Sequence, residues 1–356
     1  MRKVTVNVGT GYDVLIGNGI FDHSGEFIVN IKKNGKCAVV TDENVDRLYG
    51  ERFMNSLASA GIKAEKFVFP AGESSKNHST LLQIYDFLAA NGFTRSDYIA
   101  ALGGGVVGDT AGYAAATYMR GIDFVQVPTT IIAQSDSSVG GKTAVDIKGG
   151  KNLVGAFHQP RLVICDTDTF STMPQHFFSD GMAEVIKYGM IKSSSLFDLL
   201  AECDIKNNFD DIIEQCVSIK ARVVENDERE KGERMLLNFG HTFGHALEKY
   251  YNFSGLTHGF AVAIGMSVFT HIAEKRGMAK SGIAERLDSL LLKCGLPVED
   301  PAPLEELYKI SLGDKKHLTN GMNIIICSDI GKSEVIKMST DEYYNFLTQD
   351  GKSISV

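Results

Sequence analysis

The chain has 356 residues, of which 44% are apolar and 22% are charged, and its formal net charge at pH 7 is −8. This is the composition of an ordinary globular protein, and the length exceeds what one hydrophobic core usually organises, so we expect two domains. A negatively charged chain has no long-range attraction for nucleic acid or anionic membranes, which argues against both as partners.

The cysteines and the N-terminal stretch indicate a cytoplasmic protein. The six cysteines are scattered without a C-x-x-C pair, which is typical of a reducing compartment. The first residues alternate like a β-strand and lack the apolar core of a signal peptide. The longest apolar run, 260–272, is too short to span a bilayer and contains His271.

Strands and helices alternate in the first half of the chain. A hairpin is expected from 4–8 and 12–16, which flank a Gly-Thr-Gly turn. Further strands are expected at 36–41, 64–69, 98–102, 124–127 and 162–166, with helices at 44–60, 78–91 and 106–118. This alternation predicts βαβ units on a parallel sheet, where ligands bind at the carboxyl ends of the strands.

Three expected strand ends carry residues suited to a dinucleotide. One strand runs into Gly103-Gly-Gly-Val-Val-Gly-Asp109, a glycine-rich turn that opens a helix and can hold a phosphate on free N–H groups. Its spacing is not G-x-G-x-x-G, and an ordinary tight turn is an equal alternative. Asp42 with Asn44, and Thr129 with Thr130, follow two other strands, and an acidic residue there suits ribose hydroxyls. Together these ends predict a dinucleotide site.

The stretch from Asp136 to Asn152 is polar, rich in glycine and too irregular for a long helix. A long stretch without strong secondary structure inside a compact domain is usually a functional loop. Lys142 and Lys151 could be solvated surface charges. The adjacent glycine pairs can instead let the backbone wrap a phosphate or carboxylate.

The chain becomes helical after Pro174. Helices are expected at 177–200, 205–230, 234–250, 260–276, 282–294 and 304–312, with a short hairpin of 323–327 and 334–337. Ser339 and Glu342 form a capping box for a last helix. We therefore expect a Rossmann-like α/β domain over 1–174 and a mainly helical domain over 175–356, with the active site in the cleft between them.

The expected helix 234–250 carries polar residues at spacings of 4, 3, 4 and 3, namely Arg234, Asn238, His241, His245 and Glu248. At about 100° per residue they share a stripe roughly 80° wide, while the other faces are apolar. A lone buried histidine is usually a hydrogen-bonded core residue, but this many aligned polar groups are costly without a site. His241 and His245, at i and i+4, could share one metal.

A second ligand arrangement is also open. Glu184 and Lys187 lie at i and i+3 of a helix whose neighbours are too apolar for a surface ion pair, and His258 opens another apolar helix. Glu184, His258 and one histidine of the 234–250 helix would form a catalytic zinc arrangement with an open coordination position.

Several long motifs, in one order and over nearly the whole chain, resemble the 3-dehydroquinate synthase family. These motifs lie at 70–76, 103–109, 118–121, 126–130, 136–152, 155–160, 181–189, 237–245 and 256–259. Other sugar-phosphate cyclases share much of this pattern, and glycerol dehydrogenase-like proteins share only the architecture.

The resemblance implies a cytoplasmic lyase of the shikimate pathway and aromatic amino acid biosynthesis. It would convert 3-deoxy-D-arabino-heptulosonate 7-phosphate to 3-dehydroquinate and phosphate, with catalytic NAD and one divalent metal, zinc or cobalt. The implied metal ligands are Glu184, His241 and His258, which replaces the pairing of the two histidines at i and i+4. His245 then becomes an acid/base group beside the metal.

The resemblance also implies the remaining site residues. The residues that would hold NAD are Asp42, Asn44, Glu73, Ser74, Ser75, Lys76, Gly104, Gly105, Val106, Val107, Gly108, Asp109, Thr129, Thr130, Lys142, Lys151, Thr169, Phe170, Ser171 and Thr172. The residues that would serve the substrate and catalysis are His245, Lys142, Asp136, Lys187, Lys220, Arg234, Asn238, Asn152, Lys316 and Arg120.

Each substrate residue has a role suited to its chemistry. Arg234 with Asn238 suits a carboxylate, which a guanidinium can grip through two hydrogen bonds. The phosphate is assigned to Lys142, Asn152 and one of Lys315 and Lys316, with Lys316 favoured. Asp136, Lys187 and Lys220 suit hydroxyls or proton relay. Arg120 is implied to reach the phosphate from a second subunit, and hence a homodimer.

Two features of the 136–152 stretch depart from the family, and three other functions compete. Asp146 stands where many members have Asn, and 148–150 replaces a commoner proline-containing version. The competing functions are another sugar-phosphate cyclase (2-deoxy-scyllo-inosose or valiolone type), an NAD- and metal-dependent alcohol dehydrogenase, and a non-catalytic binding module. The cations Arg234 and Lys142 favour a doubly anionic substrate, and His245 favours catalysis.

Overall fold

The computed structural model describes residues 1–32, 34–313 and 321–348. The chain forms two compact units, Met1–Met173 with Phe209–Glu228, and Pro174–Asn208 with Arg229–Val356. Helix α8 (Phe209–Asn226) thus belongs to the first unit, which differs from the expectation of one helical domain over 175–356. The reason is that α8 packs on the first two strands, and its Asp211 pairs with Arg2 at 2.5 Å.

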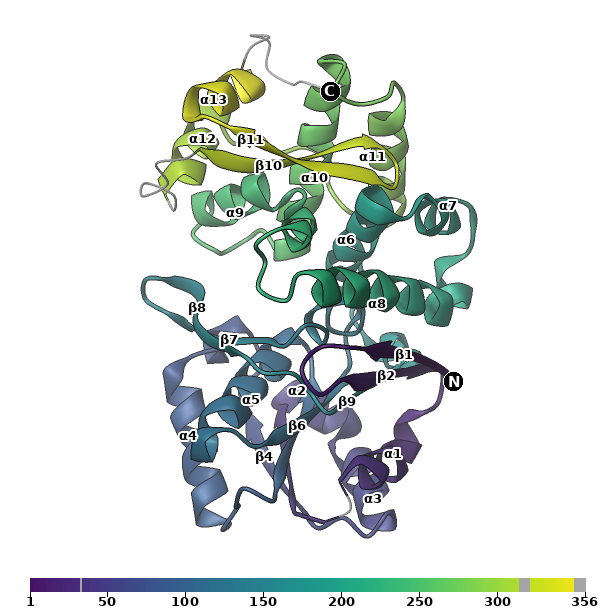
Figure 1. Ribbon diagram of the computed structural model, residues 1–356, viewed down its shortest axis with the longest axis vertical. Helices are drawn as coiled ribbons and strands as arrows, with labels where there is room; N and C mark the ends of the chain where they lie inside the picture. Colours follow the sequence, from purple (N-terminus) through teal and green to yellow (C-terminus); the bar gives the residue numbers. More distant parts are fainter. Residues whose placement is uncertain (33, 314–320, 349–356) are drawn as a thin grey trace. The chain divides into compact units, whose positions relative to one another are not determined.

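A seven-stranded sheet organises the first unit (Figure 1), in the order β1-β2-β9-β6-β5-β3-β4. The strands are β1 Arg2–Val6, β2 Tyr12–Gly17, β3 Cys37–Asp42, β4 Ala64–Phe69, β5 Tyr98–Gly103, β6 Asp123–Pro128 and β9 Leu162–Asp166. Only the β1–β2 hairpin is antiparallel within this sheet. The expected α/β class with a parallel, Rossmann-like sheet is confirmed.

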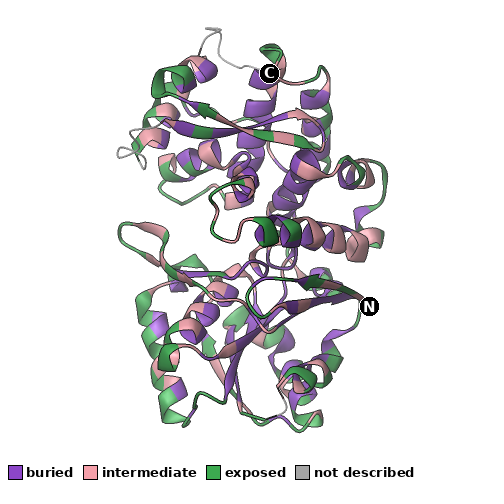
Figure 2. Cartoon of the chain, in the orientation of Figure 1, coloured by how far each residue is buried: buried purple, intermediate pink, exposed green. Residues whose placement is uncertain are grey.

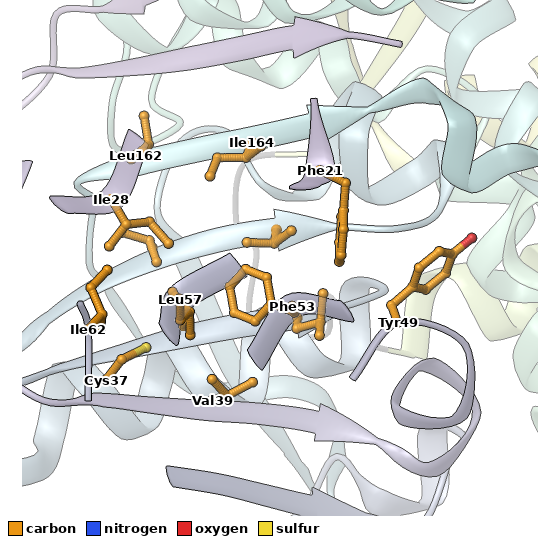
Figure 3. Packing of buried hydrophobic residues seen from close by; sticks show 14 of the residues in the cluster. Phe21, Ile28, Cys37, Val39, Tyr49, Phe53, Leu57, Ile62, Leu162 and Ile164 are labelled. Atoms are coloured by element: carbon orange, nitrogen blue, oxygen red, sulfur yellow. The ribbon is translucent and has the colours of Figure 1, made fainter. Parts of the chain in front are cut away.

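Helices cover both faces of this sheet because successive side chains of a buried strand point in opposite directions. Cys37 and Val39 of β3 face one apolar cluster, shown in Figure 3, with residues of α1 and α3. Ala38 and Val40 face a second cluster, with residues of α4 and α5. The first unit's helices are α1 Ser24–Ile31, α2 Glu43–Val45, α3 Glu51–Ser59, α4 His78–Ala90, α5 Gly105–Thr117 and α8.

Two local features of the first unit differ from the sequence expectation. The expected helix 44–60 contains a π-helical turn, Asp46–Gly50, between α2 and α3. The stretch 136–152, expected to be an irregular loop, is largely a hairpin of β7 (Lys142–Ile147) and β8 (Gly150–Phe157). Figure 2 shows much of β8 exposed or half-buried. A strand with so little buried surface lacks the apolar alternation that would reveal it.

The second unit is built around α10 (His258–Lys275), which is buried along most of its length (Figure 2). The other elements are α6 Gln175–Lys192, α7 Ser194–Glu202, α9 His241–Tyr250, α11 Ile283–Lys293, α12 Leu304–Gly313, α13 Thr340–Thr348 and the hairpin β10 Met322–Asp329 with β11 Lys332–Met338. The capping box is confirmed, since the Ser339 and Glu342 side chains accept each other's backbone N–H at 3.2 and 2.7 Å. None of the described helices is both long and apolar enough to cross a membrane.

The prediction of one continuous helix over 234–250 is wrong. A 3₁₀ turn, Glu233–Asn238, ends before Phe239, which has extended backbone angles, and α9 starts only at His241. Between them Gly240 has φ +78°, and a Cβ there would lie 2.7 Å from the carbonyl oxygen of Val262. Close packing against α10 therefore requires the break, and the five polar residues do not share one helical stripe.

Candidate functional site

Three side chains of the second unit meet at one point. Glu184 lies in the middle of α6, His241 is the first residue of α9, and His258 is the first residue of α10. The Nε2 atoms of His241 and His258 lie 3.4 and 3.6 Å from Oε1 of Glu184. One possible ligand atom from each residue lies within 4.8 Å of the others, which is close enough for all three to hold one metal ion.

The start of α10 is fixed by the turn of α6 that precedes Glu184. The backbone N–H of Gly259 donates to Oδ1 of Asp180 at 2.7 Å, which caps the helix. A Cβ on Gly259 would lie 1.9 Å from the Asp180 carbonyl oxygen, so the two backbones touch. Asp180 thus anchors the start of α10. Glu184, four residues later on α6, faces His258, the first side chain of α10.

Both imidazoles are oriented through their second nitrogen. Nδ1 of His241 lies 3.1 Å from the Phe239 carbonyl oxygen, and Nδ1 of His258 lies 3.3 Å from Oε2 of Glu248. A proton on each Nδ1 satisfies these acceptors and leaves the Nε2 of each ring facing Glu184, where it can bind a metal. This is the arrangement by which outer hydrogen bonds set the tautomer of metal-binding histidines.

Charge at this point is concentrated and buried. Burial opposes ionisation of Glu184, but the ammonium of Lys187, which donates to Oε2, and the two imidazoles hold its pKa well below the usual value. Burial lowers the pKa of His241 to about 3, although Glu184 acts in the opposite direction. Burial also disfavours a charged His258, yet Glu184 and Glu248 raise its pKa to about 10.

The donor set fits a divalent metal. Glu184 is only 1% exposed, and no hydrogen bond to its Oε1 is found among the described residues. An orphaned buried carboxylate oxygen is costly unless a cation compensates it. Two nitrogens and one oxygen are the ligand types that zinc and cobalt accept, and three protein ligands leave a position open.

His245 lies one helical turn after His241 on α9 and is exposed. Its ring centroid is 5.4 Å from that of His241 and 5.9 Å from that of His258. His245 forms a second possible ligand group with Glu248 and His258. Within the described part of the chain, neither ligand group pairs His241 with His245, so the structure gives no support to the spacing-based pairing.

The second unit also contains residues that were predicted to bind the substrate, and most of them lie on other elements than the two ligand histidines. Arg234 lies in the 3₁₀ turn and is 2% exposed, which requires compensation for a buried cation. Asn238 ends the same turn and donates to Oε1 of Glu230 at 2.7 Å. Lys187 is buried beside Glu184. Lys315 and Lys316 lie outside the described residues.

The expected NAD residues of the first unit gather at one edge of the sheet. Strands β9, β6, β5 and β3 are parallel neighbours, so their carboxyl ends lie together. Gly104 caps α5 and exposes the first N–H groups of that helix, and the N–H of Thr129 donates to the Gly103 carbonyl at 3.0 Å. Asp42 ends β3, and its side chain accepts from the backbone of Asn44. This edge offers N–H donors of the kind that bind a pyrophosphate.

A polar network joins Lys76 to the β7–β8 hairpin. Its Nζ lies 2.6 Å from Oδ2 of Asp109 and 2.5 Å from Oδ1 of Asn152. Asp146, the position that departs from the family, accepts from the Asn152 backbone at 2.8 Å and donates its own N–H to the Lys76 carbonyl at 2.7 Å. The Asp146 carboxylate thus closes the hairpin onto Asn152, while the Asp146 backbone N–H and the Asn152 side chain connect the hairpin to Lys76.

Further expected residues have defined positions in the first unit. Nζ of Lys220 on α8 lies 2.6 Å from Oδ1 of Asp136. Thr172 ends a 3₁₀ turn that starts directly after β9 and lies 2.5 Å from the Tyr49 hydroxyl. Lys142 is exposed at the start of β7, and Lys151 is half-buried in β8. Arg120 is exposed, with φ +71°, directly after Met119 at φ +49°.

Sequence reasoning missed the roles of three residues at these sites. Asp180 caps α10, Glu248 holds His258, and Tyr49 supports the turn at Thr172. The i, i+4 spacing of Asp180 and Glu184 on one helix was an available signal. The contact of Glu248 joins two different helices, so no local spacing could have revealed it.

Comparison with known proteins identifies the family. The family descriptions 3-dehydroquinate synthase N-terminal and 3-dehydroquinate synthase C-terminal match residues 66–180 and 181–317. The 3-dehydroquinate synthase of Clostridium botulinum (strain Alaska E43 / Type E3) is 46% identical over 351 residues, which cover 97% of this chain and 100% of that protein. The chain belongs to the 3-dehydroquinate synthase family. The expected enzyme class, a phosphate-eliminating lyase, is confirmed by this membership.

Solved structures of sugar-phosphate cyclases are similar to this member of the 3-dehydroquinate synthase family. A 2-deoxy-scyllo-inosose synthase complexed with carbaglucose-6-phosphate, NAD+ and Co2+ has a TM-score of 0.86 and 26% identity, covering 97% of this chain and 99% of that one. A 2-epi-5-epi-valiolone synthase from Streptomyces hygroscopicus subsp. jinggangensis 5008 with NAD+ and Zn2+ bound has a TM-score of 0.86 and 26% identity, covering 98% of each chain. The fold is therefore shared well beyond the family.

Proposed function

We propose that the chain converts 3-deoxy-D-arabino-heptulosonate 7-phosphate to 3-dehydroquinate and phosphate in the shikimate pathway. The observation that carries this proposal is the Glu184, His241 and His258 group, with His245 beside it, in a member of this family. NAD and zinc or cobalt are the cofactors, which agrees with the similar structures that hold NAD+ and Co2+ or Zn2+.

The residues at the strand ends of the first unit would hold NAD, which would supply reversible hydride acceptance at the substrate's C5. Glu184, His241 and His258 would hold a metal, which would supply Lewis acidity to neighbouring hydroxyls. Oxidation at C5 acidifies the adjacent C–H, which permits elimination of phosphate. His245 accepts and returns protons, because its exposed ring lies beside both ligand histidines. Lys187 holds the second oxygen of Glu184 and keeps that carboxylate ionised.

The two anionic ends of the substrate are assigned to different cations. Arg234 with Asn238 binds the carboxylate, because a guanidinium matches two carboxylate oxygens. Lys142 and Asn152 bind the phosphate, with Lys316 as a third contact. Lys220, paired with Asp136, serves hydroxyls or proton relay. A sugar phosphate without a carboxylate gives no reason to bury Arg234, which favours this substrate over those of the sister cyclases.

The test is phosphate release from this substrate with NAD present, before and after removal of metal by a chelator, with NADH absorbance recorded at the same time. We expect phosphate release that zinc restores, without net NADH. Accumulation of NADH without phosphate release would identify an alcohol dehydrogenase. No reaction by folded protein with metal bound would assign the chain to another sugar phosphate.

We also propose a cytoplasmic homodimer in which Arg120 serves the phosphate of the partner's site. The six cysteines, all in the described part, are free thiols, as expected in a reducing compartment. Left-handed backbone at two consecutive non-glycine residues, Met119 and Arg120, is costly and is typical of functional positions. A mixture of inactive Arg120→Ala and His241→Ala chains should regain activity if Arg120 acts across subunits. Absence of regain in mixed dimers would place Arg120 in its own subunit's site.

A further inference from the structure

Glu248 is a buried carboxylate that the proposed reaction does not use. It lies on α9, one turn after His245, and is 4% exposed. Its Oε2 is 3.3 Å from Nδ1 of His258, the first residue of α10. A carboxylate in this position must be compensated, because an isolated buried anion is strongly destabilising.

The two histidines of the ligand group differ in what holds them. Nδ1 of His241 faces the neutral carbonyl of Phe239, which lies two residues earlier in the same chain segment. Nδ1 of His258 faces the anionic Glu248 of a different helix. A carboxylate acceptor fixes the ring more strongly and increases the basicity of the opposite nitrogen, as in the carboxylate–histidine–metal triads of other proteins.

We propose that Glu248 is a positioning residue that holds His258 with Nδ1–H toward itself and Nε2 toward the metal. This inference rests on the ligand set proposed above. It assigns Glu248 an action through His258, and none on the substrate. It also makes His258 the stronger donor of the two imidazoles, so that loss of Glu248 weakens metal binding although Glu248 does not touch the metal.

The alternative is that Glu248 is itself a ligand, with His245 and His258. The geometry disfavours it, because that group uses neither His241 nor the orphaned buried oxygen of Glu184. The Nε2 atoms of His241 and His258 converge instead on Oε1 of Glu184. That oxygen has no hydrogen bond from any described residue, which marks it as the point that a cation completes.

The chain provides a matched control on the same helix. His271, near the other end of α10, has its Nε2 2.6 Å from Oδ2 of Asp288 on α11. This is also a carboxylate–histidine pair between two helices, but neither residue belongs to the ligand groups found in the described residues. Glu248→Gln and Asp288→Asn each remove one carboxylate charge from a carboxylate–histidine pair between α10 and another helix, and only the first should affect metal.

The experiment measures zinc affinity by competition with a chromophoric chelator, and the visible absorption spectrum of the cobalt-loaded protein. We expect Glu248→Gln to bind zinc about 10–100-fold more weakly and to change the cobalt spectrum, as outer-sphere substitutions do. Asp288→Asn should have the zinc affinity and the cobalt spectrum of the parent protein. Glu248→Leu should bind zinc more weakly than Glu248→Gln, because the amide oxygen of glutamine still accepts a hydrogen bond from His258 and leucine cannot. Circular dichroism of each metal-free variant establishes that it is folded.

Three outcomes would overturn the inference, and Glu184→Gln distinguishes the first two. If Glu248→Gln keeps parental zinc affinity and spectrum while Glu184→Gln loses zinc, Glu248 does not position His258 and the proposed ligand set stands. If Glu184→Gln keeps zinc while Glu248→Gln loses it entirely, Glu248 is a ligand and the proposed ligand set is itself wrong. Equal weakening by Glu248→Gln and Asp288→Asn would show a general effect of destabilising α10.

Discussion

The candidate NAD site and the candidate metal site are built in different ways. In the first unit the residues follow the ends of parallel strands, where the sheet itself places them side by side. In the second unit the residues begin two helices and occupy the middle of a third, and only tertiary packing brings them together.

The difference extends to how charge is compensated. Lys76 and Asp109 of the first unit neutralise each other, and the backbone N–H groups at the start of α5 add uncharged donors. The second unit buries two carboxylates beside two half-buried imidazoles, and one carboxylate oxygen is satisfied by no described group. Protein groups therefore compensate the charges of the Lys76–Asp109 pair, whereas the candidate metal site needs a cation to compensate its carboxylate oxygen.

The largest expected effect is on activity, and it distinguishes a metal ligand, His241, from an acid/base residue, His245. His241→Ala should lose metal and activity together, because it removes one of the three proposed ligands. His245→Ala should keep its metal and lose turnover by about a hundredfold to ten-thousandfold, the usual range for a general acid or base. Metal content by atomic absorption and single-turnover rates distinguish the two. Release of metal by His245→Ala would favour the second ligand group.

The break before α9 provides the next largest effect. Gly240→Ala should lower the free energy of unfolding by about 3 kcal/mol, since it adds left-handed strain and a clash with the Val262 carbonyl. Gly277→Ala is the matched control, because Gly277 has φ +68° with no atom within 4 Å of a built Cβ. We expect about 1 kcal/mol there, from strain alone. Equal losses in urea unfolding would mean that packing against α10 does not require the break.

The charge pair of the first unit should have an intermediate effect. Lys76→Met removes the cation that pairs with Asp109 and should lower the free energy of unfolding by about 2 kcal/mol, because a poorly solvated carboxylate is left behind. NAD affinity should also fall if this edge holds the cofactor. The double variant Lys76→Met/Asp109→Leu should regain most of the stability but not the NAD affinity. Full additivity of the two substitutions would show that the residues are not coupled.

The smallest expected effect is a pH dependence of the free energy of unfolding, caused by a histidine that belongs to neither candidate site. The hydrogen bond from His271 to Asp288 raises the pKa of His271 in the folded protein. Its stabilisation is therefore fully present below the unfolded pKa of about 6.5 and is lost as pH rises through the folded pKa. The ring is partly exposed, so we expect at most about 1 kcal/mol. Urea unfolding of the parent and His271→Gln should differ more at low pH than at high pH, and a pH-independent difference would contradict this.

Local patterns determined much of the first unit. The order of strands and helices, and the positions of Asp42, the glycine-rich turn and Thr129 at strand ends, follow from alternation and from glycine. The β7–β8 hairpin was not predicted, because an exposed polar strand lacks the apolar signal that reveals a buried one. The capping box at Ser339 was predicted because its hydrogen bonds lie within four residues.

The sequence by itself predicted a polar site of histidines, carboxylates and an arginine in the helical half, and the structure brings the histidines and carboxylates together. The spacing of His241 and His245 suggested a shared metal, and only tertiary structure directs Nε2 of His241 and of His258 to Glu184 instead. Packing of Gly240 against α10 breaks the expected helix, and Glu248 meets His258 across two helices. Contacts between segments depend on how helices pack, and no periodicity within one segment records that.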